Sequence, residues 1–457
     1  MKKFILSVLI LLICFAVGFA VWKFIEKNGE KYKEITMTAT VTYIGEDFFI
    51  VKDQNHKQYY FDMKDSYDIQ VGDQLNIKYN THYQTEKQKK IYTVLNYKKM
   101  MPEEEKKEEN ESIVPMLWQD NGIFQSYYEE AYQTMQQMTL DEKIAQLLLV
   151  RYPSENAVSI LEQYQFGGYV LFGRDFKDKT QDQVKEMISQ LQSVSKIPIL
   201  TAVDEEGGTV VRISSNPNLA SHKFQSPQEL YQAGGFAMIE KDTLEKSQLL
   251  MNYGINLNLA PVVDVSTNPE DYMYERTLGE DASLTSRYAE TVISASKETS
   301  VSYTLKHFPG YGNNVDTHTG MAIDKRSYDE IEKDALQPFE AGIQSGAEAV
   351  LISHNVIVNM DESNPASLSI NVHNLLRDQL QFTGIVMTDD LAMKAVSDIP
   401  NVVIKALLAG NDLIITTDYE TSIQSIKSAL EQDLIDESII DHAVFRVIAW
   451  KYYKGLL

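Results

Sequence analysis

Short hydrophobic runs alternate with amphipathic stretches from residue 116 to the C-terminus. The runs are apolar at consecutive positions, which is typical of parallel strands covered on both faces. Amphipathic stretches at 181–194, 243–253, 284–299 and 328–345 have helical spacing. The runs expected to form strands are 146–151, 168–172, 199–203, 256–263, 302–305, 349–353, 384–388 and 412–416. Eight such units predict an α/β fold, a (β/α)8 TIM-type barrel domain at 116–457, with a doubly wound sheet as the alternative.

Two segments before this domain have other patterns. Residues 36–100 contain period-2 alternation broken by turn signals, which predicts a small all-β domain of the OB-like or SH3-like kind. We assign no ligand to it. Residues 101–115 carry a dense charge run without apolar anchors, which predicts an acidic linker.

The N-terminus contains a long apolar segment. Residues 4–24 carry only one charge, Lys23, and follow Met-Lys-Lys. About 20 apolar residues suffice to cross a bilayer, so we expect a signal anchor or transmembrane helix within residues 1–30, with a cleaved signal peptide as the alternative. The catalytic domain is then expected outside the cell membrane, on the extracellular, cell-wall side.

Charge and cysteine content exclude several functions. The chain has 42 basic and 65 acidic side chains, a net charge of −23, which argues against a nucleic-acid partner. The single cysteine, Cys14, lies in the apolar segment and excludes an intramolecular disulfide or a cysteine-based zinc site.

Ionisable side chains follow most of the expected strands. In a TIM-type barrel the catalytic groups lie just after the C-terminal ends of the strands, so we expect a polar pocket there. The groups concerned are Asp204, Asp264, Lys306, His307, His354, Asp389, Asp390 and Asp418.

Two of these positions suggest specific chemistry. Asp389, where an apolar strand stops, could be a nucleophile, a metal ligand or a helix N-cap, although Asp390 could supply the cap instead. The Pro- and Gly-containing loop after Lys306 carries Asp316 and His318, where the carboxylate could orient the imidazole as a proton shuttle. A surface histidine bonded to its neighbour is the plainer interpretation of that pair.

Other chemistries remain as weaker alternatives. Lys306 at a strand end could form a Schiff base, but a charged pocket does not favour an uncharged lysine. A metal site could use His307, His318 and His354, but no HExxH spacing supports it. We therefore expect no metal and no cofactor.

Several ordered motifs resemble one known family. They are MTLDEKIAQ at 138–146, GGYVLFGR at 167–174, DEEGG at 204–208 with Arg212, ERTLGED at 275–281 and KHFPGYG at 306–312 followed by DTH. Together they resemble glycoside hydrolase family 3, in its bacterial β-N-acetylglucosaminidase (β-N-acetylhexosaminidase) branch, over residues 138–418. This sequence departs from the family pattern at Glu205, Thr209, Tyr311, Asn313 and Thr317, which stand where Gln, Arg, His, Asp and Ser are frequent.

The resemblance implies roles for eight residues. Asp389 would be the nucleophile, and His318 with Asp316 the general acid/base. The sugar hydroxyls would be bound by Asp204, Arg212, Arg276, Lys306 and His307. The implied activity is a retaining exo-β-N-acetylglucosaminidase that releases terminal GlcNAc, with GlcNAc-containing cell-wall (peptidoglycan) fragments as its carbohydrate substrate.

Alternative functions stay open at this point. A β-glucosidase or β-xylosidase of the same family is one, and a non-catalytic cell-wall sugar-binding protein is another. The sequence also leaves open whether water or phosphate accepts the sugar.

Overall fold

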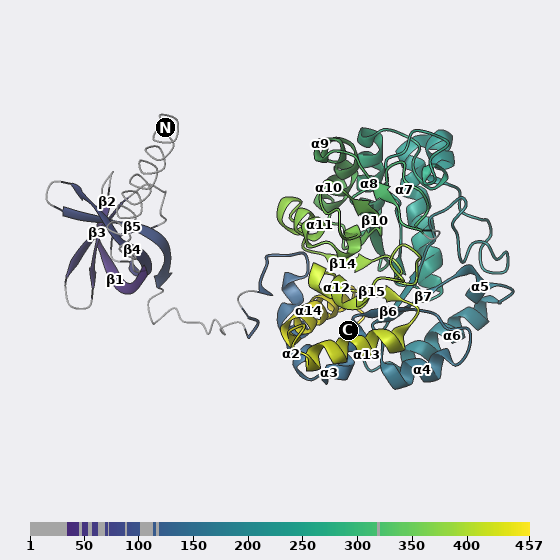
Figure 1. Cartoon of the computed structure of the whole chain (residues 1–457), viewed down its shortest axis with the longest axis horizontal. Helices are drawn as coiled ribbons and strands as arrows, with labels where there is room; N and C mark the ends of the chain where they lie inside the picture. Colours follow the sequence, from purple (N-terminus) through teal and green to yellow (C-terminus); the bar gives the residue numbers. More distant parts are fainter. Residues whose placement is uncertain are drawn as a thin grey trace, which may run out of the picture. The chain divides into compact units, whose positions relative to one another are not determined.

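The structure, a computed structural model, describes residues 34–44, 48–53, 57–62, 69–71, 73–86, 89–100, 113–115, 118–317 and 320–457. The chain divides into two compact units, Met1–Glu111 and Ser112–Leu457. Figure 1 draws the N-terminal strands in purple and the larger unit in blue to yellow.

The first unit contains a closed five-stranded β-barrel. Its strands are β1 (Glu34–Ile44), β2 (Phe48–Asp53), β3 (Gln58–Asp62), β4 (Gln74–Glu86) and β5 (Lys89–Met100), in the order β1-β2-β3-β5-β4. Only β3 and β5 pair in parallel; the other pairs are antiparallel. Alternate residues such as Phe49, Val51 and Phe61 form the core. A five-stranded barrel fits the OB-like alternative. Of the expected acidic linker, only residues 113–115 are described.

The second unit is built on eight parallel strands, and all eight expected runs form one. They are β6 (Leu148–Arg151), β7 (Gly168–Leu171), β8 (Leu200–Val203), β9 (Leu257–Asn258), β10 (Ser302–Phe308), β12 (Ala349–Ile352), β14 (Ile385–Thr388) and β15 (Ile414–Thr416). They pair in the order β14-β12-β10-β9-β8-β7-β6-β15. β15 approaches β14 through a single bridge between Met387 and Leu413, so the barrel is nearly closed.

Helices surround these strands (Figure 1). They are α2 (Tyr128–Gln136), α3 (Leu140–Gln146), α4 (Ala157–Tyr164), α5 (Gly173–Phe176), α6 (Gln181–Val194), α7 (Pro227–Asn252), α8 (Ala282–Ser296), α9 (Tyr328–Glu330), α10 (Leu336–Gln344), α11 (Ile370–Asn374), α12 (Val402–Ala409), α13 (Tyr419–Glu431) and α14 (Glu437–Tyr453). A short two-stranded sheet, β11 (Ile323–Asp324) with β13 (Val356–Ile357), lies outside the barrel sheet. The helix expected at 328–345 contains a π-helical turn between α9 and α10.

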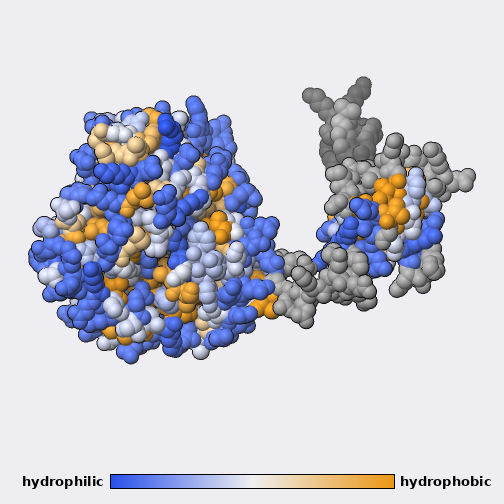
Figure 2. Space-filling model, turned by 180° about the vertical axis from the view of Figure 1, so that it is seen from behind, coloured by the Kyte–Doolittle hydropathy of each residue, from blue (hydrophilic) through white to orange (hydrophobic). Residues whose placement is uncertain are grey.

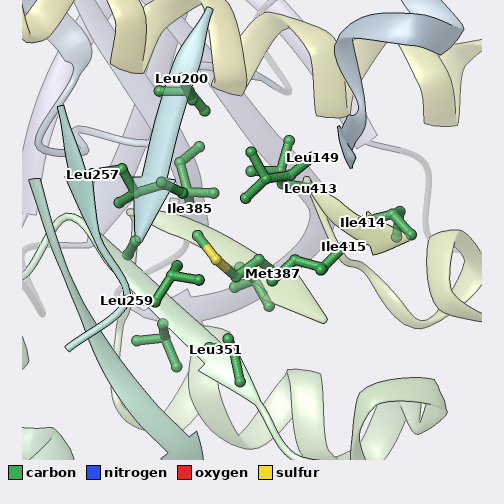
Figure 3. Packing of buried hydrophobic residues seen from close by; sticks show 14 of the residues in the cluster. Leu149, Leu200, Leu257, Leu259, Leu351, Ile385, Met387, Leu413, Ile414 and Ile415 are labelled. Atoms are coloured by element: carbon green, nitrogen blue, oxygen red, sulfur yellow. The ribbon is translucent and has the colours of Figure 1, made fainter. Parts of the chain in front are cut away.

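The barrel interior is filled by apolar side chains from different strands. Figure 3 shows Leu149, Leu200, Leu257 and Ile385 converging near the barrel centre. All four are at most 1% exposed. Alternate strands contribute the side chains of each layer in such a barrel, so the interior is a packed core and the polar groups gather towards the C-terminal ends of the strands.

The surface explains where the charge resides. The face in Figure 2 is mostly hydrophilic over the larger unit, with apolar side chains in small separate groups. The acidic composition is therefore accommodated on a solvated surface.

The predicted fold needs one correction, the membrane anchor. None of the helices among the described residues combines the length and hydrophobicity that a bilayer crossing needs. Residues 4–24, on which that prediction rested, lie outside the described residues. The observed architecture is a small β-barrel and a nearly closed eight-stranded (β/α)8-like barrel.

Candidate active site

A cavity of about 570 Å³ opens at the C-terminal ends of the barrel strands. This volume is within the usual range for small-ligand pockets. Six of the eight predicted site residues line it: Asp204, Arg212, Arg276, Lys306, His307 and Asp389. These six residues therefore share one location, although they come from segments up to about 185 positions apart in the chain.

Alternating charges form a chain of ion pairs on the cavity wall. Lys306 Nζ lies 2.8 Å from Asp204 Oδ1 and 2.7 Å from Glu206 Oε1. Arg212 Nη2 donates to Asp204 Oδ2 at 3.0 Å. Arg276 binds Glu206 in a bidentate way, with Nη2 2.7 Å from Oε1 and Nε 2.9 Å from Oε2. Such a network presents both donors and acceptors in fixed positions, which suits sugar hydroxyls.

The same ion pairs determine the protonation of the two carboxylates. Burial alone would raise the pKa of Asp204, but Lys306 and Arg212 hold that pKa well below its usual value. Burial likewise opposes ionisation of Glu206, and Arg276 and Lys306 lower the pKa of that carboxyl to about 2. Both groups are therefore anionic acceptors across the physiological pH range.

Local backbone structure explains the DEEGG segment after β8. Gly207 has a φ of +109°, and a Cβ there would lie 2.1 Å from the carbonyl oxygen of Gln225. Glu205 is fully buried and accepts the backbone N–H groups of Arg212 at 2.8 Å and Ile213 at 2.7 Å. The Glu found here in place of the frequent Gln thus holds the loop segment that carries Arg212.

Asp264 organises the end of β10 and the loop that follows it. Its Oδ2 lies 2.8 Å from His307 Nδ1, and its Oδ1 accepts the backbone N–H of Tyr311 at 2.6 Å. Asp264 is 1% exposed and His307 is 5% exposed. The carboxylate fixes the orientation of the imidazole, so His307 can present its other nitrogen to a bound group.

Asp389 lies directly after β14 and lines the cavity. Its Oδ1 accepts the N–H of Asp390 at 2.8 Å. Asp390 Oδ1 accepts the N–H of Ala392 at 2.9 Å. This bond stabilises a turn and does not cap a helix, because the next helix, α12, begins only at Val402. Burial, with a contribution from Asp389, raises the pKa of Asp390. Only Oδ1 of Asp389 is hydrogen-bonded to the turn that follows it. Its other carboxylate oxygen does not bond to that turn, and a nucleophile requires such an oxygen.

Only one of the two predicted acid/base residues is among the described residues. Asp316 is partly buried on the loop after β10, whereas His318 lies outside the described residues. Burial raises the pKa of Tyr272, and its interaction and hydrogen bond with Asp316 raise it further. Because Tyr272 lines the cavity, this contact places Asp316 at the cavity edge.

Two residues named for alternative chemistries have contacts within the protein. Lys306 is engaged by two carboxylates, an arrangement for binding rather than for Schiff-base formation. His354 Nδ1 lies 2.7 Å from Ser367 Oγ and its Nε2 lies 3.1 Å from the carbonyl oxygen of Asp390. Among the described residues, no group of three His, Cys, Asp or Glu side chains is arranged to hold a metal ion.

Three residues at this site were not among the eight to which the resemblance gave a role. Glu206 bridges two cations, Asp264 orients His307, and Tyr272 contacts Asp316. Glu206 stands in the DEEGG motif and Asp264 follows an expected strand, so the sequence offered a reason to consider each of them as a site residue. Tyr272 lies in a long loop without a motif of its own.

The chain matches known proteins along this barrel. Residues 139–450 match the family model described as "Glycosyl hydrolase family 3 N terminal domain". A "Beta-hexosaminidase" of Xylella fastidiosa (strain M23) is 32% identical over 256 residues, which are 55% of this chain and 75% of that protein. "Beta-hexosaminidase LpqI" of Mycobacterium tuberculosis is 30% identical over 325 residues, 68% of this chain and 82% of that protein.

Solved structures give the same result. A glycoside hydrolase family 3 β-N-acetylglucosaminidase from Paenibacillus sp. str. FPU-7 superposes with a TM-score of 0.66 and 29% identity, over 70% of this chain and 63% of that chain. The motif order, the strand-end cavity and the match over residues 139–450 lead to one conclusion. The chain belongs to glycosyl hydrolase family 3 and is a glycoside hydrolase.

Proposed function

We propose that the chain is a retaining exo-β-N-acetylglucosaminidase that releases terminal β-linked GlcNAc from peptidoglycan fragments. The observation that carries the proposal is the cavity that Asp389 lines together with the ion-paired Asp204, Glu206 and Lys306. The names of the relatives, β-hexosaminidase and β-N-acetylglucosaminidase, support this activity. We further propose that the domain meets these fragments on the cell-wall side of the membrane.

The proposed reaction has two steps. Asp389 attacks the anomeric carbon as the glycosidic C–O bond breaks, and His318, oriented by Asp316, gives its proton to the departing oxygen. A covalent glycosyl-enzyme forms. His318 then takes a proton from water, which attacks the anomeric carbon and releases Asp389 and the sugar with retained configuration.

The binding groups have a defined task in this scheme. Asp204 and Glu206 accept hydrogen bonds from sugar hydroxyls, while Arg212, Arg276 and Lys306 donate to sugar oxygens. Because the ion pairs already fix these groups, binding does not have to order them, and the sugar is held for in-line attack by the carboxylate.

The test compares three chromogenic glycosides that differ only in the sugar. We expect turnover of the β-N-acetylglucosaminide and at least about 100-fold lower kcat/KM on the β-glucoside and β-xyloside. Asp389→Ala should lose at least about 10³-fold in kcat. Turnover that is equal on the glucoside, or retained in Asp389→Ala, would contradict the proposal.

A second assay addresses the natural substrate. Purified protein is incubated with muropeptides that carry a terminal GlcNAc, with and without inorganic phosphate, and products are identified by mass spectrometry. Free GlcNAc in both conditions supports hydrolysis of peptidoglycan fragments, whereas GlcNAc 1-phosphate would identify phosphate as the acceptor. No release from muropeptides, with turnover of the chromogenic substrate, would contradict the peptidoglycan assignment.

A further inference from the structure

Tyr311 is a buried tyrosine in the loop after β10, where it replaces the frequent His. It is 3% exposed, and its ring packs with Val262 and Met273. Its backbone N–H donates to Asp264 Oδ1 at 2.6 Å, and its carbonyl oxygen accepts from Asn355 Nδ2 at 3.2 Å. The backbone of Tyr311 is therefore held by the same carboxylate that orients His307.

The hydroxyl of Tyr311 binds one loop residue at two points. The backbone N–H of Thr317 donates to Tyr311 Oη at 2.9 Å, and the two hydroxyl oxygens lie 3.0 Å apart. Thr317 is 1% exposed. Burial raises the pKa of Tyr311 to about 12, so the hydroxyl stays neutral and can both donate and accept.

Thr317 also contacts the segment that carries Asp389. Its carbonyl oxygen accepts the N–H of Ala395 at 3.2 Å, and Ala395 follows Asp389 by six positions. Thr317 stands between Asp316 and His318 in the sequence. A hydrogen-bonded path therefore runs from Asp264 through Tyr311 and Thr317 to the segment after β14.

We propose that Tyr311 is a positioning residue for the acid/base step, because its hydroxyl fixes Thr317, the residue that directly follows Asp316. This inference rests on the proposed function, in which Asp316 and His318 form the acid/base pair. The hydrogen bonds of Asp389 itself are with Asp390 and with the backbone of β12, and none of them uses the Tyr311 hydroxyl.

Substrates with different leaving groups distinguish a defect in positioning the acid from a general structural defect of the enzyme. An aglycone that departs as a stable anion, such as 2,4-dinitrophenolate, needs no proton in the first step. A phenyl aglycone needs one. Because kcat/KM reports the steps up to cleavage, a defect in acid positioning lowers kcat/KM for the phenyl glycoside and spares that for the dinitrophenyl glycoside.

The experiment measures kcat/KM for phenyl and 2,4-dinitrophenyl β-N-acetylglucosaminides with the full chain. Tyr311→Phe keeps the ring among its apolar neighbours and removes only the hydroxyl. We expect kcat/KM to fall about 10- to 100-fold on the phenyl glycoside, part of the contribution of a general acid, and by less than about threefold on the dinitrophenyl glycoside. Thr317→Val, which removes the partner hydroxyl, should give a selective loss of the same kind.

Two further variants make the result decisive. Tyr253→Phe removes a buried hydroxyl that donates to the carbonyl oxygen of Leu219 at 2.7 Å, with neither residue lining the cavity, and should change both rates by less than about threefold. His318→Ala should show the same selectivity as Tyr311→Phe with a larger loss. Suppose that His318→Ala is selective for the phenyl glycoside. If Tyr311→Phe then loses kcat/KM equally on both glycosides, or on neither, the role of Tyr311 is overturned. A non-selective His318→Ala would instead overturn the acid/base assignment and this inference with it.

Discussion

Replacing Lys306 by Met tests the charge network at the base of the cavity. Lys306 is 3% exposed and lies between Asp204 and Glu206, at 2.8 Å and 2.7 Å. Met has nearly the same shape but no charge. The variant therefore leaves two carboxylates facing each other without the cation that joins them, while Arg276 remains bound to Glu206.

The expected cost follows from the pKa of Glu206. That pKa is about 2 where the ordinary value is 4.5, against the opposing effect of burial. The difference corresponds to about 3 kcal/mol, shared between Arg276 and Lys306. Removing one partner of a buried ion pair costs about 3–5 kcal/mol in general, so we expect Lys306→Met to lower the free energy of unfolding by about 3 kcal/mol at pH 7.

The pH dependence has a defined sign. A carboxyl whose pKa is depressed in the folded protein contributes stability above pH 4.5 and loses it as pH falls towards 2. The difference in free energy of unfolding between wild type and Lys306→Met should thus have its largest value at pH 7 and be about 1 kcal/mol smaller at pH 3.5.

Urea unfolding followed by tryptophan fluorescence measures this difference, since Trp450 is fully buried in the barrel unit. Lys196→Met is the control: Lys196 pairs with Glu142 at 2.5 Å but its side chain is 70% exposed, so its loss should cost less than about 1 kcal/mol. A cost below about 1 kcal/mol for Lys306→Met at pH 7, or one that does not change with pH, would refute the reasoning.

Three other substitutions test the barrel itself. Burial lowers the pKa of Lys451 to about 7. Between about pH 7 and 10.5 the unfolded chain therefore binds more protons than the folded protein, and the free energy of unfolding should rise with pH in that range. Lys451→Met should abolish this rise when urea titrations at pH 7 and pH 9 are compared. Thr139→Ala removes the capping box with Glu142 and should cost about 1 kcal/mol in the same assay, with Thr139→Ser close to wild type and a value near zero contradicting the cap. Met387→Ala empties a fully buried position in the barrel and should cost about 2–5 kcal/mol, so a loss under about 1 kcal/mol would show that the interior is not packed as described.

Local sequence patterns predicted the barrel strands but not the long-range pairing between residues. The apolar runs gave all eight strands, because parallel strands buried on both faces leave a continuous hydrophobic signal. The expected helix at 243–253 is only the end of α7, which begins at Pro227 after a Ser226–Glu229 capping box. Gly234 and Gly235 leave helical geometry inside α7, which obscures its periodicity.

The site was predictable in location and less so in its contacts. Strand-end positions brought Asp204, Lys306 and Asp389 to one cavity, because all parallel strands end on the same face. The pairing of Glu206 with Arg276 depends on how a long loop folds back over the strand ends, which no local spacing encodes. The two-point bond of the Tyr311 hydroxyl to Thr317 is likewise visible only in three dimensions.

Trapping of the covalent intermediate tests the central claim most directly. A fluorinated, activated N-acetylglucosamine donor that slows hydrolysis of the glycosyl-enzyme is incubated with the full chain, and peptides are examined by mass spectrometry. We predict one sugar on the peptide that contains Asp389, and none in Asp389→Ala. Attachment to a different carboxylate, or no adduct while the enzyme consumes the donor, would contradict the assignment of Asp389 as the nucleophile.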